Sequence, residues 1–273
     1  FNKSPSLDIY SNPIKLPVNK LLEKLKFLHA EPTVIPFISG QQGIRIGNGD
    51  ALFKSSLIKE GMVYIQSAAS MIPASILEPC RGEAILDMCA APGSKSINIA
   101  QLTENRARID AWDLYEHKVN LIKQNAAKLG ITCIQAEQHD ATVVDEKRIG
   151  LYDRVLLDAP CSGLGVLAHK PEIRWRRSEE SLKEFPVIQR KLMETAAFYV
   201  KPEGILVYST CTLNKEENEE VITWFLKTHP NFKLQTFNFN GKRITEGMIT
   251  IWPDEYHTDG FFVARLIRSN SND

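Results

Sequence analysis

The order of hydrophobic and polar positions changes character near residue 66. Beyond that point, short apolar runs that end in Gly, Pro, Ser or Asp alternate with longer segments whose apolar residues recur at helical spacing. We expect strands at residues 85–89, 108–113, 132–140, 152–158 and 205–211, and further strands near the C-terminus. We expect helices at residues 94–102, 117–129, 180–200 and 215–228. Alternating strands and helices predict an α/β fold with a doubly wound, mostly parallel sheet that is covered on both faces.

Residues 1–65 follow a different pattern. Residues 18–29 carry leucines at helical spacing, and short apolar runs bounded by Pro and Gly come after them. We therefore expect a small α+β subdomain at residues 1–65 and the main domain at residues 66–273.

Composition limits the classes of function. The chain has 33 basic and 33 acidic residues, and a net charge of zero excludes a protein that coats nucleic acid through bulk charge, although it allows a local basic groove. The sequence has no run of about 18 apolar residues and no apolar segment of a signal peptide at its start, so we expect no contact with a membrane. The five cysteines include no CxxC pair, which favours free thiols in a reducing, cytoplasmic compartment.

The loop after the first predicted strand of the main domain consists of small residues. It runs Cys89-Ala90-Ala91-Pro92-Gly93-Ser94-Lys95 and leads into a helix. Small side chains let a ligand approach the backbone, and the N–H groups at a helix N-terminus face such a ligand. The loop lacks the glycine spacing of dinucleotide sites and of a P-loop. It favours a nucleoside ligand without phosphates, such as one that bears an amino-acid carboxylate, over the alternative of an ordinary tight turn.

Acidic residues follow the next two predicted strands. Asp113 lies where nucleotide-binding folds place the acid that accepts both ribose hydroxyls. Asp140 ends the third strand and is suited to accept from an adenine amino group. Each acid alone is better explained as a solvated loop residue or a helix cap. Together, at successive strand ends, they favour an adenosyl ligand.

Two cysteines follow the last two buried strands. Asp158 and Cys161 come after one strand and Cys211 comes after the other, and in a doubly wound sheet these strand ends are neighbours. A lone cysteine is usually a small buried hydrophobe, which is how we interpret the other three. A thiolate can attack an electron-poor ring carbon, with Asp158 hydrogen-bonded to the ring. The residues alone do not decide which of the two cysteines attacks.

A basic segment lies between these cysteines. It contains Lys170, Arg174, Trp175, Arg176 and Arg177. Arginine and lysine contact phosphates, and tryptophan stacks on an unpaired base. RNA binding is therefore favoured over the alternative of a solvated loop.

Five motifs occur in the order DMCAAPGSK, LLDAPCSGLG, KPEIRWRR, YSTCTLNKEENE and DGFFVARL. With them, residues 5–268 resemble the RNA (cytosine-5-)-methyltransferases of the NOL1/NOP2/Sun family, and within it the bacterial Sun/Fmu enzymes of 16S ribosomal RNA. The resemblance implies a seven-stranded Rossmann-like methyltransferase sheet, with residues 1–65 as an RNA-recognition-like subdomain. It implies RNA, foremost 16S rRNA, as the substrate and partner. Because the Sun/Fmu enzymes carry a further N-terminal RNA-binding domain, we expect this chain to be either a fragment or a shorter member; a monomer is the simplest expectation.

The resemblance also implies S-adenosyl-L-methionine as the cofactor, and it implies which residues hold it. The loop from Cys89 to Lys95 would hold the methionine part, Asp113 the ribose and Asp140 the adenine region. Lys118 stands where the family commonly has Arg, and it keeps the charge without the planar fork of donors. The family also commonly has Gly where this chain has Ser94.

For catalysis, the resemblance implies that Cys211 attacks C6 of cytosine and that C5 then takes the methyl group. Cys161 would help to eliminate the C5 hydrogen and to release the product, while Asp158 lies between the cofactor and the target base.

Three other interpretations of the function remain open. A non-catalytic RNA-binding or ribosome-assembly factor that keeps the fold is the main alternative, and the retention of Asp158, Cys161 and Cys211 counts against it. A thiol-disulfide enzyme is disfavoured by the missing CxxC pair, and a nicotinamide dehydrogenase by the missing glycine pattern.

Overall fold

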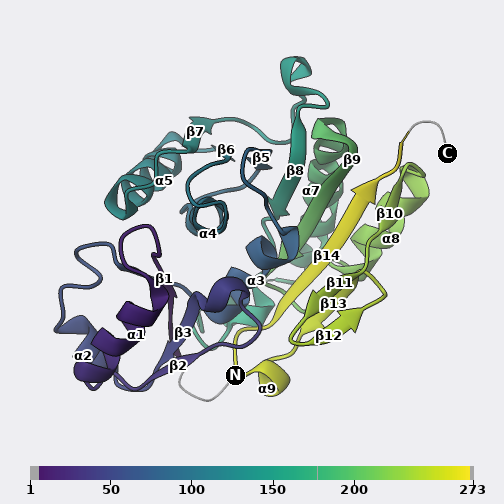
Figure 1. Cartoon of the computed structure of the whole chain (residues 1–273). Helices are drawn as coiled ribbons and strands as arrows, with labels where there is room; N and C mark the ends of the chain where they lie inside the picture. The colour runs from purple at the N-terminus through teal and green to yellow at the C-terminus, as the bar shows by residue number, and fades with distance from the viewer. Residues whose placement is uncertain (1–5, 177, 271–273) are drawn as a thin grey trace.

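The computed structural model describes residues 6–176 and 178–270, and its largest element is an eight-stranded sheet (Figure 1). Seven strands lie side by side in the order β10 (Phe232–Leu234), β14 (Phe261–Arg268), β9 (Val200–Thr210), β8 (Tyr152–Asp158), β5 (Ala84–Asp87), β6 (Arg108–Asp113) and β7 (Ile134–Gln138). The eighth, β13 (Met248–Ile251), pairs with β14. The strands from β9 to β7 are parallel, and β14 is antiparallel to each of its partners. The predicted fold class is confirmed, but the expected number of seven strands is wrong, because β13 adds an eighth strand by pairing with β14.

Helices cover both faces of this sheet. One face is covered by α3 (Ala68–Leu77), α4 (Ser94–Leu102) and α5 (Glu116–Leu129), and the other by α7 (Glu179–Tyr199) and α8 (Glu219–Thr228). The strands alternate their apolar side chains between two cores. In β8, Leu156 belongs to the core with α3 to α5, whereas Val155 and Leu157 belong to the core with α7 and α8.

Helix α3 is an element that the hydrophobic pattern did not predict. Eight of its ten residues are buried, because it packs against the larger sheet, α4 and β1 (Leu7–Ser11). In Figure 1 it lies between β1 and β14. A helix that is apolar on nearly every side lacks the period of an amphipathic helix, so its pattern gives no helical signal.

A smaller antiparallel sheet is formed by the N-terminal part of the chain. Its strand order is β2 (Pro32–Val34), β3 (Gly43–Ile46), β1 and β4 (Val63–Ile65), with α1 (Val18–Phe27) and α2 (Gly49–Phe53) beside it. The buried Asp8 in β1 accepts from Arg45 Nε at 2.8 Å and from the backbone N of Ala68 at 3.1 Å. This carboxylate therefore ties the smaller sheet to α3. The division of the chain at residues 65 and 66 stays a prediction.

The remaining elements are short. They are η1 (Ser39–Gln41), η2 (Glu146–Arg148), η3 (Leu164–Val166), α6 (Ile173–Arg176), β11 (Phe237–Phe239), β12 (Lys242–Ile244) and α9 (Pro253–Tyr256). Strands β11 and β12 pair only with each other within the described residues. No helix in the described part of the chain is both long and apolar enough to cross a bilayer.

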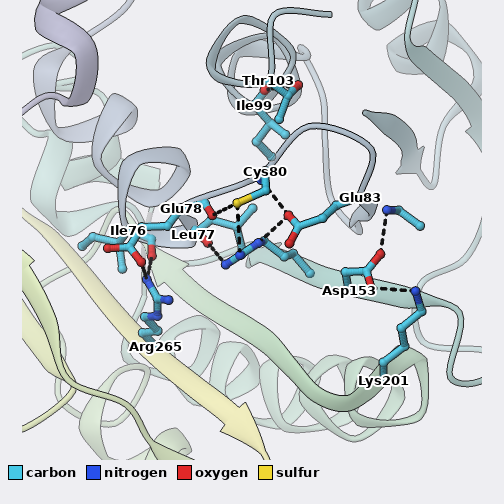
Figure 2. A network of polar contacts seen from close by, with 12 residues as sticks. Ile76, Leu77, Glu78, Cys80, Glu83, Ile99, Thr103, Asp153, Lys201 and Arg265 are labelled. Atoms are coloured by element: carbon cyan, nitrogen blue, oxygen red, sulfur yellow. Dashed lines mark hydrogen bonds and ion pairs between the residues drawn. The ribbon is translucent and has the colours of Figure 1, made fainter. Parts of the chain in front are cut away.

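Ion pairs close the amino ends of the strands in the larger sheet (Figure 2). Arg154 Nε lies 2.6 Å from Glu83 Oε2, and Lys201 Nζ lies 2.6 Å from Asp153 Oδ1. The other oxygen of Asp153 accepts from the backbone N of Ala84 at 2.8 Å, where β5 begins. We refer to Glu83, Asp153, Arg154 and Lys201 as the amino-edge network.

Candidate active site

The two cysteines that follow β8 and β9 face each other at the opposite, carboxyl edge of the sheet. The parallel pairing of these strands ends with Asp158 opposite Ser209. Just beyond, the Sγ atoms of Cys161 and Cys211 are 3.2 Å apart, and both thiols are free. The fold thus turns two positions that are distant in sequence into one two-thiol site.

The two thiols differ in protonation. A hydrogen bond from Cys161 lowers the pKa of Cys211, and the positive charges of Lys95 and Lys170 act in the same direction against burial and Asp158. The same hydrogen bond raises the pKa of Cys161 well above its ordinary value, and burial adds to this rise. The pair therefore shares a proton that resides on Cys161 and leaves Cys211 as the better nucleophile.

Asp158 is fixed beside the thiols by contacts to both of its oxygens. Its Oδ2 lies 2.6 Å from Lys95 Nζ, and its Oδ1 accepts from Ser209 Oγ at 2.8 Å. Lys95 reaches this position from the first turn of α4, and it also donates to Ser70 Oγ at 3.0 Å. Burial alone lowers the pKa of Lys95, but the charge of Asp158 and its hydrogen bond outweigh burial and raise it. Lys95 is therefore a charged group beside Asp158 and the thiols.

The small-residue loop from Cys89 to Lys95 makes a tight turn between β5 and α4. Its Gly93 has a φ of +100°, and a Cβ there would lie 3.2 Å from Ile122 Cγ2. The backbone N of Gly93 donates to the carbonyl of Ala90 at 2.7 Å. The peptide bond between Ala91 and Pro92 is cis. Both the conformation and the close neighbour require glycine at position 93.

Asp87, directly before this loop, is fully buried with one oxygen unpaired. Ser96 Oγ donates to its Oδ2 at 2.6 Å, whereas its Oδ1 has no hydrogen-bond partner among the described residues. Burial raises the pKa of Asp87 to about 7; the bond from Ser96 opposes this rise, and the charge of Asp158 adds to it. A buried acceptor without a donor calls for a partner outside the chain. Together with a helix N-terminus that suits a carboxylate, it fits the amino-acid portion of S-adenosylmethionine.

Asp113 has one engaged oxygen and one available oxygen. Its Oδ1 accepts from the backbone N of Tyr115 at 3.3 Å and lies 3.7 Å from Lys118 Nζ. Within residues 6–176 and 178–270, no hydrogen bond to its Oδ2 is found. The side chain is only 9% exposed at the end of β6. Asp113 therefore has an acceptor to offer a hydroxyl pair.

Asp140 has a different environment. It is exposed, and its Oδ1 accepts from both the backbone N and Oγ1 of Thr142, at 2.9 and 2.7 Å. These hydrogen bonds lower the pKa of Asp140. The loop is brought next to the end of β6, since the backbone N of His139 donates to the carbonyl of Asp113 at 3.0 Å. The turn contacts fit the alternative of a loop cap, and the adenine contact stays a prediction.

The basic segment lies on the surface. Lys170 and Arg174 are exposed, and Trp175 is 89% exposed. Just before them, His169 Nδ1 lies 2.8 Å from Oδ1 of the buried Asp259. Arg177 and the side chain of Arg176 lie outside the part of the chain that the structure describes. The exposed aromatic and basic side chains are available to a ligand, and their role in RNA binding stays a prediction.

A protein-family model described as 16S rRNA methyltransferase RsmB/F matches residues 74–267, a range that includes all the strand ends described above. The chain belongs to this family. The RsmB/F match agrees with the resemblance to the Sun/Fmu enzymes, which is thereby confirmed.

Relatives of this RsmB/F chain include both B and F enzymes. The probable ribosomal RNA small subunit methyltransferase B of Synechocystis sp. is 37% identical over 273 residues, covering 97% of this chain and 61% of the relative. The ribosomal RNA small subunit methyltransferase F of Escherichia coli is 34% identical over 270 residues, covering 95% of this chain and 56% of the relative. The chain thus spans less than two thirds of the length of these curated relatives.

Among solved structures, a methyltransferase homolog protein from Pyrococcus horikoshii superposes with a TM-score of 0.86 at 29% identity. The match covers 97% of this chain and 87% of that protein. It supports the Rossmann-like methyltransferase fold of this RsmB/F chain.

Sequence reasoning missed three buried polar residues of this RsmB/F site. From the sequence, Asp87 was expected only to end a strand, and no role was predicted for Glu217 or Asn218. The last two belong to the run KEENE, whose composition is typical of the solvated start of a helix. Their burial, at 0% and 1% exposure, comes from the tertiary fold.

Proposed function

We propose that this chain transfers a methyl group from S-adenosyl-L-methionine to C5 of a cytosine in RNA, through a covalent bond between Cys211 and C6. The observation that carries the proposal is the thiol pair, in which the Sγ atoms of Cys161 and Cys211 lie 3.2 Å apart beside Asp158. The curated relatives are named as ribosomal RNA small subunit methyltransferases, which supports RNA as the substrate and 16S rRNA as its expected form.

S-adenosylmethionine supplies an electrophilic methyl group. We assign its methionine part to the loop from Cys89 to Lys95 and to the available oxygen of Asp87. Asp113 is assigned to the ribose, with Lys118 balancing its charge, and Asp140 to the adenine region. The buried Oδ1 of Asp87, which has no hydrogen-bond partner among the described residues, supports the assignment.

In the proposed reaction the Cys211 thiolate adds to C6 of the cytosine, which makes C5 nucleophilic. Asp158, held by Lys95 and Ser209, contacts the ring between the cofactor and the base. After methylation, a base takes the C5 proton, the C5–C6 double bond re-forms and the Cys211 sulfur leaves as a thiolate. We assign this base to Cys161, after it has lost its own proton to solvent, because its Sγ lies 3.2 Å from that of Cys211. The target base must be unpaired or flipped out of its stack to reach these groups.

The RNA contacts are proposed for two regions. The basic segment offers Lys170, Arg174, Trp175, Arg176 and Arg177 to phosphates and bases. Residues 1–65 are proposed as a separate RNA-recognition subdomain in front of the methyltransferase domain at residues 66–273. Free thiols and a ribosomal RNA substrate support a cytoplasmic location. A monomer is proposed as the simplest oligomeric state.

The test is a methyl-transfer assay with methyl-labelled S-adenosylmethionine and 16S rRNA, followed by digestion of the RNA to nucleosides and chromatography. We expect the label in 5-methylcytidine. Label in another nucleoside, or none despite measurable binding of the cofactor and the RNA, would reject the proposal. A Cys80→Ala variant is the matched control for thiol removal, because Cys80 lies at the amino edge of the sheet, and it should retain full activity.

A further inference from the structure

Glu217 is a buried carboxylate that the proposed chemistry does not use. It lies between β9 and α8 and is 0% exposed. Its Oε2 accepts from the backbone N of Ser162 at 2.9 Å and from Gln189 Nε2 at 3.1 Å. Its Oε1 accepts from Asn214 Nδ2 at 3.2 Å. A buried carboxylate is tolerated where donors replace its hydration, and here three N–H groups do so.

These contacts hold the backbone on both sides of Cys161. The N–H of Ser162, directly after it, is bound by Glu217. The carbonyl of Pro160, directly before it, accepts from Gln189 Nε2 at 3.0 Å, and the same amide nitrogen donates to Glu217. One carboxylate and one amide thus fix both peptide units that flank the thiol.

The next residue, Asn218, holds the backbone around Cys211 in the same way. Thr210 Oγ1 donates to Asn218 Oδ1 at 2.6 Å, and Asn218 Nδ2 donates to the carbonyl of Thr212 at 3.0 Å. Two consecutive residues of one turn therefore hold the two thiol loops, one loop each.

The thiol loops need such a connection because the strand pairing stops before them. The parallel ladder of β8 and β9 ends at Asp158 and Ser209, and beyond it the two loops share single contacts. Ala159 N donates to the Ser209 carbonyl and Gly165 N to the Cys211 carbonyl, both at 2.9 Å, and the hydroxyls of Ser162 and Thr212 lie 2.8 Å apart. Cys161 and Cys211 lie beyond this point. A displacement of about 1 Å would break a contact between two sulfur atoms at 3.2 Å.

We propose that Glu217, together with Asn218, is a positioning residue that locks the two thiol loops to one turn and so keeps Cys161 as the hydrogen-bond donor of Cys211. The importance of this role for catalysis rests on the proposed function, whereas the role itself is measurable on the thiols. The negative charge of Glu217 also contributes to the raised pKa of Cys161, which keeps the shared proton on that sulfur.

The test is the pH dependence of Cys211 alkylation by iodoacetamide in the full chain without RNA, followed for each cysteine by peptide mass spectrometry. In Glu217→Ala we expect alkylation of Cys211 at neutral pH to slow about tenfold, which corresponds to a rise of about one unit in its pKa. Glu217→Gln keeps an acceptor but loses the charge, so we expect about a threefold effect. The control is Glu216→Ala, an exposed glutamate one position earlier, which should match the wild type.

The direction of the change in the Cys211 alkylation rate, and its dependence on Cys161, distinguish a positioning role from a purely electrostatic one. Removal of a negative charge by itself lowers the pKa of a nearby thiol and would speed alkylation. In a Cys161→Ala background, Glu217→Ala should change Cys211 alkylation by less than about twofold, because Glu217 acts through Cys161.

Two results would overturn the inference: wild-type alkylation of Cys211 in a Glu217→Ala variant with wild-type thermal unfolding, or an undiminished effect in the Cys161→Ala background. If Glu217→Ala does not fold, Glu217→Gln decides by the same criteria. Failure of the wild-type chain to methylate RNA would reject the proposed function and leave the alkylation results standing.

Discussion

The two ends of the larger sheet differ in how their carboxylates are paired. At the amino ends, each carboxylate of the amino-edge network contacts a cation of the same network (Figure 2). At the carboxyl ends, Asp87, Asp113 and Asp158 lie near Lys95 and Lys118, and one oxygen of Asp87 has no partner among the described residues. The carboxylates at the amino ends are therefore neutralised within the protein, whereas the carboxyl ends keep acceptors and a thiolate available for ligands. The predictions below test this contrast.

The largest effect, on methyl transfer, is expected for removal of the Cys211 thiol at the carboxyl end of the sheet. Cys211→Ala should reduce methyl transfer at least about 1000-fold, because the covalent step loses its nucleophile. Cofactor affinity should change less than about twofold, since no cofactor contact is assigned to this side chain. Cys80→Ala, at the amino edge, should keep wild-type turnover. Persistent turnover in Cys211→Ala, measured by label transfer to RNA, would show that another group attacks.

The acids at the two edges should respond differently to neutralisation. Asp113→Ala should weaken S-adenosylmethionine binding about tenfold to hundredfold, the usual range for losing hydrogen bonds to a charged acceptor. Asp153→Asn in the amino-edge network should leave this affinity unchanged, although it removes the ion pair with Lys201. Isothermal titration calorimetry measures both values. Equal affinities of the wild type and Asp113→Ala would remove the ribose assignment.

Asp87 should make the stability of the unliganded chain depend on pH. Its pKa is about 7 in the fold and near its ordinary value when unfolded, so the folded state binds the extra proton between these values. Its contribution to stability is therefore fully present at low pH and is lost as pH rises toward 7. Relative to the wild type, Asp87→Asn should gain about 1 to 2 kcal/mol between pH 5 and pH 7. Denaturant unfolding at several pH values measures this difference, and parallel curves for the two proteins would contradict it.

The smallest effects are expected in the exposed basic segment. Trp175→Ala should weaken RNA binding about fivefold through loss of stacking. Arg174→Ala should lower the slope of log affinity against log salt by about one. Trp252→Ala, a half-exposed tryptophan outside the segment, is the control and should bind RNA normally. Unaltered affinity and salt slope in filter-binding assays would support a solvated loop instead.

The placement of the site at one edge of the sheet could be predicted from the sequence. Each apolar strand run is followed at once by small or reactive residues, and in a doubly wound sheet such positions gather at the carboxyl edge. Asp113, Asp158, Cys161 and Cys211 all lie there in the structure. The segments with strand and helix periodicity were also long enough to predict the α/β class.

The position of the shared proton could not be predicted in this way. It depends on a contact of 3.2 Å between sulfur atoms and on the charges of Lys95, from α4, and Lys170, from the segment before α6. Sequence spacing contains no such distance, so the residues alone left the nucleophile undecided. The positive charges of Lys95 and Lys170, which lower the pKa of Cys211, favour it as the nucleophile.

Buried polar groups were also beyond the sequence pattern. The acidic run around Glu217 is typical of a solvated helix start, and only the packed loops of Cys161 and Cys211 explain its burial. Asp140 shows the reverse case, because the threonine two positions later is a recognisable signal for a side-chain-capped turn. That signal was available in the sequence and explains the contacts of Asp140 Oδ1 with Thr142.

The central claim is that Cys211 attacks the RNA while Cys161 is needed for release. The most direct measurement incubates the Cys161→Ala protein with S-adenosylmethionine and ribosomal RNA and then separates the products on a denaturing gel. We expect a protein–RNA adduct that disappears in the Cys161→Ala/Cys211→Ala double variant. An adduct that persists without Cys211, or no adduct although the RNA and the cofactor bind, would contradict it.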